Sequence, residues 1–155
     1  MASTTKIIVS NRAALKAKYT AGLAKVDQAI KALIASDRAR GIKTKLISID
    51  DATAMKKVKG KAVTSTSDEK GAKTAVDAIF KALAPIEYLM ILGGPDIVPH
   101  ITLINPAKDD DANVPSDLPY ACDAAYGRTV DAFLAPTRVV GRLPDGWAAR
   151  RRPLW

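Results

Sequence analysis

Hydrophobic residues follow two patterns along the chain, one typical of strands and one typical of helices. Each change of pattern marks the boundary of an expected element. Residues 6–9 form a short, β-branched apolar run that is typical of a strand. From Leu15 to Ile34 the apolar residues recur every three or four positions, which places them on one stripe of a helix. This pattern predicts a strand near 6–9 and a helix near 12–39, with Asn11 as an N-cap and Gly41 ending the helix.

The same alternation continues through the middle of the chain. Residues 45–49 predict a second strand, and the polar, basic stretch 52–65 predicts a loop. Thr66 and Glu69 have the spacing of a capping box, which predicts a helix near 67–83 that Pro85 ends.

The most apolar stretch is the run that ends at Gly93-Gly94-Pro95-Asp96. A near-continuous apolar run predicts a strand near 87–92 that is buried on both faces of a parallel sheet. Functional residues of such sheets gather at the carboxyl ends of the strands. Residues 93–136 show little periodicity and are expected to form a long functional or mobile loop, and a fourth strand is predicted near 138–141.

Strands that alternate with helices indicate the α/β class. We therefore expect a three-layer sandwich with a mainly parallel four-stranded sheet and helices on both faces. Residues 1–145 are expected to form one domain, and residues 146–155 an irregular basic tail that contains Arg150-Arg151-Arg152. The tail is unlike a natural domain ending, and a truncation or a shifted reading frame would each explain it.

The charge of the chain changes the picture only slightly. The 155 residues carry a formal charge of +8, and residues 1–84 hold 17 Lys and Arg against 7 Asp and Glu. Solvated helix faces account for lysines of this kind. Few aromatic residues accompany them for base stacking, so we expect no nucleic-acid partner.

The sequence also gives little support for a membrane-spanning segment or for a disulfide bond. No run approaches the roughly 18 apolar residues of a membrane span, and the N-terminus lacks the pattern of a secretory signal. We therefore expect no membrane partner and a cytoplasmic location by default. Cys122 is the single cysteine, which excludes an internal disulfide and a cysteine-rich metal site.

Two acidic groups are candidate ligand sites. Asp50 and Asp51 follow the second strand and could bind a metal or a ribose, but capping the next turn is the preferred interpretation. Asp109-Asp110-Asp111 offers hard oxygen ligands for calcium without the EF-hand spacing, so a solvated loop is preferred. We expect neither a metal nor a cofactor.

Three blocks of sequence carry a family resemblance. They are Leu89-Met90-Ile91-Leu92-Gly93-Gly94-Pro95-Asp96-Ile97-Val98-Pro99-His100-Ile101-Thr102, Ser116-Asp117-Leu118-Pro119-Tyr120 and Val139-Val140-Gly141-Arg142-Leu143-Pro144. In this order they resemble the gingipain-like cysteine peptidases of the caspase-like fold. The resemblance covers roughly residues 86–145 and implies a caspase-like, flavodoxin-like topology.

The resemblance implies that the catalytic residues of the family lie outside this sequence. In the family a His in a Gly-His-Gly turn and a Cys after a later strand both follow the Gly-Arg block. His100 and Cys122 lack that context, and we expect them to form no dyad, so we predict no catalytic residue. Asp117 and Tyr120 are the substrate-binding residues that the resemblance implies, and a turn-capping Asp117 is the alternative.

The sequence thus predicts a truncated or non-catalytic subdomain of a gingipain-like cysteine peptidase that is inactive alone. Its expected partner is the missing catalytic half, with a peptide substrate if completed, or a second copy bound through the sheet edge. An exposed Asp117 and mobility across residues 106–116 are part of this prediction. A non-catalytic interaction module, or a small-molecule or nucleotide-binding domain that uses Gly93-Gly94, is the alternative.

Overall fold

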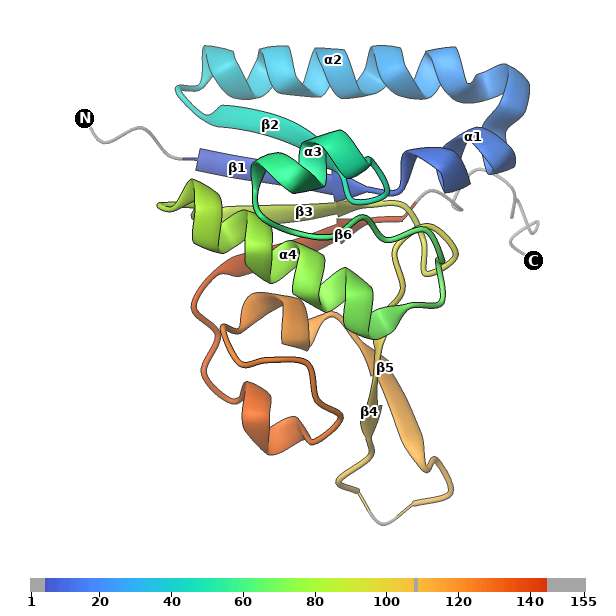
Figure 1. Ribbon diagram of the computed structural model, residues 1–155, viewed down its shortest axis with the longest axis vertical. Helices are drawn as coiled ribbons and strands as arrows, with labels where there is room; N and C mark the ends of the chain where they lie inside the picture. The colour runs from blue at the N-terminus through green and yellow to red at the C-terminus, as the bar shows by residue number, and fades with distance from the viewer. Residues whose placement is uncertain (1–4, 108, 145–155) are drawn as a thin grey trace, which may run out of the picture.

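A computed structural model describes residues 5–107 and 109–144 of the chain. A four-stranded parallel sheet lies at its centre, with the strand order β2-β1-β3-β6 (Figure 1). The strands are β1 (Thr5–Ser10), β2 (Lys43–Ser48), β3 (Tyr88–Leu92) and β6 (Val139–Leu143). The predicted tail at 146–155 lies outside the described residues.

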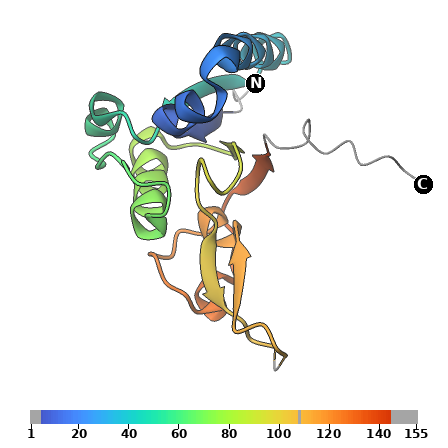
Figure 2. The ribbon, with the colours of Figure 1, turned by 90° about the vertical axis from the view of Figure 1, so that its right-hand side faces the viewer.

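Helices cover both faces of this sheet. Helices α1 (Arg12–Tyr19) and α2 (Leu23–Ala39) lie on one face, and α3 (Ala52–Lys57) and α4 (Glu69–Leu83) lie on the other (Figure 2). Residue Lys6 of β1 pairs with Thr44 of β2 and with Tyr88 of β3 in parallel register. The predicted three-layer α/β sandwich with a parallel sheet is confirmed, and its order is that of flavodoxin-like sheets.

The core lies where β1 and β3 meet the helices. Ile8, Val9 and Ile91 are fully buried at the centre of the sheet, as a near-continuous apolar strand requires. On α4 the buried residues Ala72, Val76 and Ile79 recur at steps of four and three, so one stripe of the helix faces the sheet.

Both acids after β2 cap helices, but only Asp51 caps the next turn, as the sequence predicted. Asp51 is the N-cap of α3 and accepts hydrogen bonds from the Thr53 and Ala54 amides. Asp50 accepts from the first amides of α1, those of Arg12 and Ala13. Both carboxylates thus satisfy free amides at helix N-termini.

Two predictions about helices were wrong. Residues 52–65 were expected to form a loop, but α3 occupies part of them. A helix of six residues is too short to show an apolar period, and Met55 is its single buried residue. The predicted helix at 12–39 is also interrupted, because the 3₁₀ turn Thr20–Gly22 separates α1 from α2.

The predicted capping box at the start of α4 does not form. Asp68 is the N-cap instead and accepts from the Gly71 amide at 2.8 Å. The Glu69 carboxylate turns away from its own helix and accepts from the amide and hydroxyl of Thr102. A long-range partner has therefore replaced the local one.

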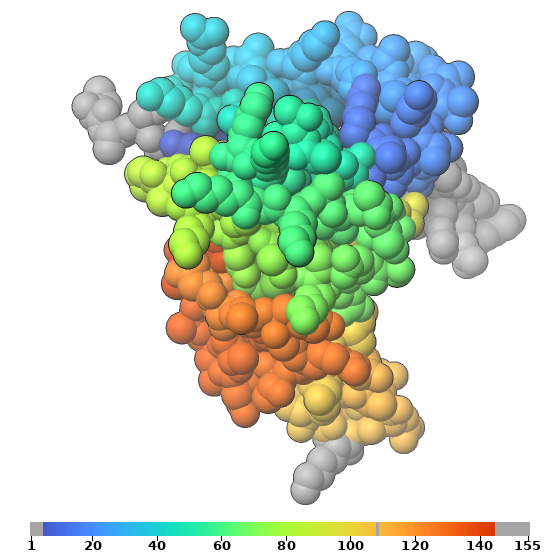
Figure 3. All heavy atoms as spheres, viewed as in Figure 1, coloured from blue at the N-terminus to red at the C-terminus, as the bar shows by residue number. Residues whose placement is uncertain are grey.

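The region 93–136 contains short elements that the sequence did not predict. Strands β4 (Ile101–Ile104) and β5 (Asn113–Ser116) form an antiparallel hairpin, and 3₁₀ helices occupy Leu118–Ala121 and Val130–Phe133. Elements of four residues are too short for a period to be visible. The space-filling view shows this region as a lobe beside α4 (Figure 3). Residues 113–116 therefore form a strand within the segment that was expected to be mobile.

None of the helices in the described part of the chain is long and apolar enough to cross a membrane.

Candidate functional site

The carboxyl ends of all four parallel strands lie at one edge of the sheet, where a site was expected. Hydrogen bonds between neighbouring strand ends hold this edge together. The Ser10 hydroxyl donates to the Leu92 carbonyl at 2.8 Å, and the Gly93 amide donates to the Leu143 carbonyl at 3.0 Å. Gly93 has a φ of +114°, which only glycine adopts readily, and the chain turns sharply there.

Arg142 of β6 organises this edge. Its Nε and Nη2 donate to the two carboxylate oxygens of Asp117 at 2.8 and 2.6 Å. Its Nη1 donates to the carbonyls of Gly93 and Val98 at 2.9 and 2.8 Å. All three guanidinium nitrogens therefore have acceptors, in the bidentate geometry that arginine favours with carboxylates.

Asp117 also binds the imidazole of His100. The Nδ1 atom of His100 lies 3.0 Å from Asp117 Oδ1. The Asp117 side chain is only 22% exposed and both of its oxygens are occupied, so the prediction of an exposed carboxylate was wrong. The reason is that the chain supplies its own basic partner. Side chains of β6 alternate between the two faces of the sheet, so Arg142 lies on the same, less exposed face as Val140. This alternation is the sequence signal that could have indicated the role of Arg142.

Tyr120 lies behind Asp117 in the core. It is fully buried, and its hydroxyl donates to the Pro99 carbonyl at 2.8 Å. Burial raises the pKa of the phenol, so Tyr120 is neutral and anchors the loop. None of the surface of Tyr120 is accessible in this structure, and its contact with substrate stays a prediction.

His100 and Cys122 have separate partners. The Cys122 thiol is buried and donates to the Phe133 carbonyl at 3.4 Å, whereas His100 binds Asp117. Burial also raises the pKa of the thiol, which disfavours the nucleophilic thiolate. The two residues therefore have different partners in this structure, and the absence of a dyad stays a prediction.

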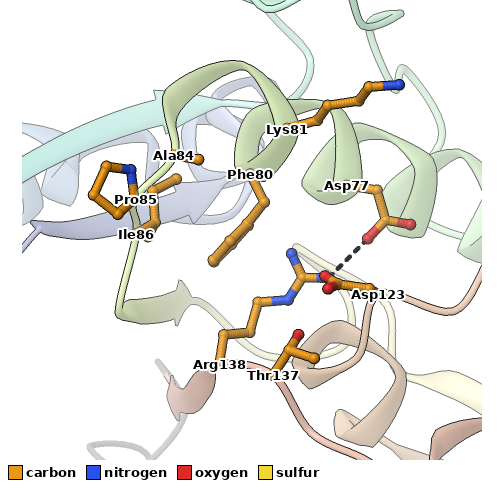
Figure 4. Close-up of a pocket in the computed structure, with 9 residues that line it drawn as sticks. All are labelled: Asp77, Phe80, Lys81, Ala84, Pro85, Ile86, Asp123, Thr137 and Arg138. Carbon is orange, nitrogen blue, oxygen red and sulfur yellow. Dashed lines mark hydrogen bonds and ion pairs between the residues drawn. The ribbon is translucent and has the colours of Figure 1, made fainter.

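The sequence missed a second polar cluster, which consists of Lys73, Asp77 and Arg138 (Figure 4 shows the last two). The Lys73 ammonium lies 2.6 Å from both Asp77 oxygens and 3.1 Å from the Cys122 carbonyl. Arg138 Nη2 lies 3.0 Å from Asp77 Oδ1 and 2.6 Å from the same carbonyl. Solvated helix faces are the expected place for lysines of this chain, but the position of Lys73 on α4 buries it completely.

Within residues 5–107 and 109–144 no group of three or more His, Cys, Asp or Glu side chains is placed to hold a metal ion. The acidic run near Asp109 is engaged in local bonds, in which Asp109 accepts from the Asn105 side chain and the Asp111 amide.

Comparison with known proteins identifies a shared fold. No protein-family profile and no curated protein sequence matches the chain. One solved structure, described as that of a protease, superimposes with a TM-score of 0.53 at 16% sequence identity. The match covers 94% of this chain and 25% of the protease chain, so the chain spans about a quarter of that protein's length. At this identity the likeness establishes a common fold with part of a protease.

Proposed function

We propose that the chain is a non-catalytic subdomain of a gingipain-like cysteine peptidase. The observation that carries the proposal is the contact made by the three blocks of the resemblance. Arg142 of the third block binds Asp117 of the second, and it binds the Gly93 and Val98 carbonyls of the first. Because one guanidinium links residues of all three blocks, we expect a sequence that contains one block to contain the other two. The fold shared with part of a protease supports the same proposal.

In this proposal Asp117 is a positioning residue at the edge of the substrate pocket. Its carboxylate holds the His100 ring and the Arg142 guanidinium at the carboxyl ends of β3 and β6. The partly exposed His100 is the member of this group that a bound peptide would reach first. The completed protein would take a peptide substrate beside it.

The partner in this proposal is the missing catalytic half, docked on the β6 side of the sheet. None of the residues in the described ranges pairs with the outer edge of β6. Val139 is 59% exposed and Leu143 is 50% exposed. Leu143 also lines an apolar groove of about 410 Å³ with residues of α1, α2 and β3. Exposed apolar surface on an edge strand favours association with further structure.

An assay of peptidase activity tests the expected inactivity. We expect no cleavage of basic or acidic peptide substrates by the purified 155-residue chain, because the Cys122 thiol is buried and protonated. The Cys122→Ala variant is the control. Cleavage by the parent chain that is lost in this variant would overturn the prediction.

The family assignment has a separate test, which is the nucleotide sequence downstream of the Trp155 codon, read in all frames. A Gly-His-Gly turn followed by an apolar strand that ends in Cys is the expected finding. A downstream region that encodes neither feature in any frame would count against the assignment and leave the inactivity result untouched.

A non-catalytic interaction module is the second candidate, and the exposed apolar surface of β6 favours it. A phosphate site at Gly93-Gly94 receives less support. The Gly93 amide already donates to Leu143, and residues 94–100 after the turn form no helix whose N-terminus could hold a phosphate.

A further inference from the structure

A cavity of about 490 Å³ lies at the opposite edge of the sheet, near the amino ends of β3 and β6. Figure 4 shows its walls, with Phe80 of α4 and the turn Ala84–Ile86 on one side and Thr137 and Arg138 on the other. Most of the lining is apolar, and the charged groups gather at one end. This combination is typical of sites that bind small organic molecules.

Arg138 is the unusual group in this cavity. Its side chain is 2% exposed, and its guanidinium carbon lies 4.0 Å from the centroid of the Phe80 ring. Only Nη2 has acceptors, namely Asp77 and the Cys122 carbonyl. The Nε and Nη1 atoms are buried and find no hydrogen-bond partner among the described residues. Buried donors of a charged group are nearly always paired, so two unpaired nitrogens point to an absent acceptor.

Arg142 provides the internal comparison. It lies in β6, the strand that begins directly after Arg138, is also largely buried, and has an acceptor for each of its three nitrogens. The fold thus pairs every nitrogen of the buried guanidinium at the carboxyl end of β6. It leaves two nitrogens unpaired on the guanidinium at the amino end. The guanidinium with unpaired nitrogens, that of Arg138, is the one that lines the cavity.

The charge around Arg138 indicates the nature of the missing acceptor. Lys73 and Arg138 are two buried cations, and among the described residues Asp77 is the only carboxylate that binds both. Asp123 is 3.3 Å from Arg138, but its side chain is 75% exposed and compensates weakly. Lys81 is exposed, and its ammonium points away from the cavity (Figure 4). An anion therefore fits this end of the cavity better than a neutral acceptor.

We propose that this cavity binds a small carboxylate that carries an apolar group. The carboxylate would accept hydrogen bonds from the unpaired nitrogens of Arg138, and the apolar group would lie against Pro85 and Ile86. Because Nε and Nη1 are shielded from water, side chains of the cavity wall must move to admit the carboxylate. The inference does not depend on the peptidase relationship, since it uses other residues and the other edge of the sheet.

Nuclear magnetic resonance of the ¹⁵N-labelled chain tests this site directly. The probe is 3-phenylpropanoate, and 3-phenylpropanol is its neutral counterpart. We expect the carboxylate to shift the Arg138 Nε–H signal saturably below about 10 mM, together with signals of the Phe80 ring. The alcohol should produce little shift. The Arg142 Nε–H signal serves as the control and should stay in place.

A variant gives an independent measurement that does not risk the fold. Asp123→Asn removes an exposed carboxylate that competes for Arg138, so it should tighten binding of 3-phenylpropanoate by about threefold. The Arg138→Lys spectrum assigns the signal, and contacts to the Phe80 ring assign it if that variant does not fold. Equal shifts with acid and alcohol, shifts at Arg142 of the same size, or no saturable shift would overturn the proposal.

Discussion

At the scale of single residues, buried charge is what distinguishes this chain from a generic α/β domain. Asp117 and Arg142 form a bidentate pair that joins the β5 end to β6 and fixes the turn after β3. Removing one partner of such a pair leaves the other charge without compensation, which costs more than the pair itself contributes. The two charged clusters are therefore the most sensitive positions in the chain.

Replacing Asp117 by Asn should lower the free energy of unfolding by about 2–3 kcal/mol, because Arg142 would keep only weak neutral acceptors. Urea denaturation followed by circular dichroism measures this change. Asp96→Asn is the matched control, since the exposed Asp96 carboxylate binds Lys18 at the surface and should change stability by less than about 1 kcal/mol. Equal effects of the two substitutions would contradict the prediction.

The Lys73 cluster should respond asymmetrically to substitution. Asp77→Asn leaves Lys73 without a carboxylate partner and Arg138 with only the exposed Asp123, so it should cost about 3 kcal/mol. Lys73→Met leaves one cation with one anion and should cost only about 0–1 kcal/mol. Burial already lowers the pKa of the Lys73 ammonium, so its loss also removes a desolvation penalty. Urea denaturation of both variants measures the two changes in the free energy of unfolding. A larger loss for Lys73→Met than for Asp77→Asn would contradict the explanation by unpaired buried charge.

At the scale of elements, the turn after β3 is held by a close approach. A Cβ atom added to Gly93 would lie 2.6 Å from the Cβ of Ile97, on a backbone with φ of +114°. Packing and backbone geometry therefore both require glycine at this position. The opposite case is Gly141 in β6, where an added Cβ meets no atom within 4 Å.

Gly93→Ala should consequently destabilise the fold by about 2–4 kcal/mol, through backbone strain and steric overlap with Ile97. Gly141→Ala should leave stability within about 0.5 kcal/mol of the parent chain. Thermal unfolding of the two variants at one pH provides the comparison. The account fails if Gly93→Ala unfolds at the temperature of the parent.

At the scale of the whole molecule, the sheet has one face that its own helices do not fully cover. The parallel register puts Tyr88, Val139 and Leu143 on the face of α1 and α2, and all three are exposed. The groove of about 410 Å³ lies between these strands and the two helices. An apolar face at an edge strand is where further structure or a second copy would bind.

We therefore expect the isolated chain to self-associate through β6. Light scattering over a concentration series should show a mass that rises above 16.5 kDa. Leu143→Lys should return the chain to a monomer, because it places a charge in the apolar groove. Leu134→Lys is the control, since Leu134 is also exposed but lies outside β6. A strict monomer for the parent chain would argue against the predicted partner surface.

The α/β class, the four strands of the sheet and the cap at Asn11 could all be predicted from the sequence. These follow from periodicity and from side chains that act within a few residues, which a single sequence displays. It also indicated the three blocks that meet at the carboxyl edge. It missed α3 and the β4–β5 hairpin, because such short elements show no period and depend on contacts elsewhere.

The partners of the charged residues, in contrast, could be identified only from the tertiary structure. Asp117 binds Arg142 across 25 positions, and Lys73 shares the Cys122 carbonyl with Arg138, which lies 65 positions away. Nothing local distinguishes Lys73 from the solvated lysines of the other helices, and Asp117 looked like an exposed acid or a turn cap. The ionic contacts of a residue depend on which distant segments the sheet brings beside it, and burial then determines whether its charge must be paired.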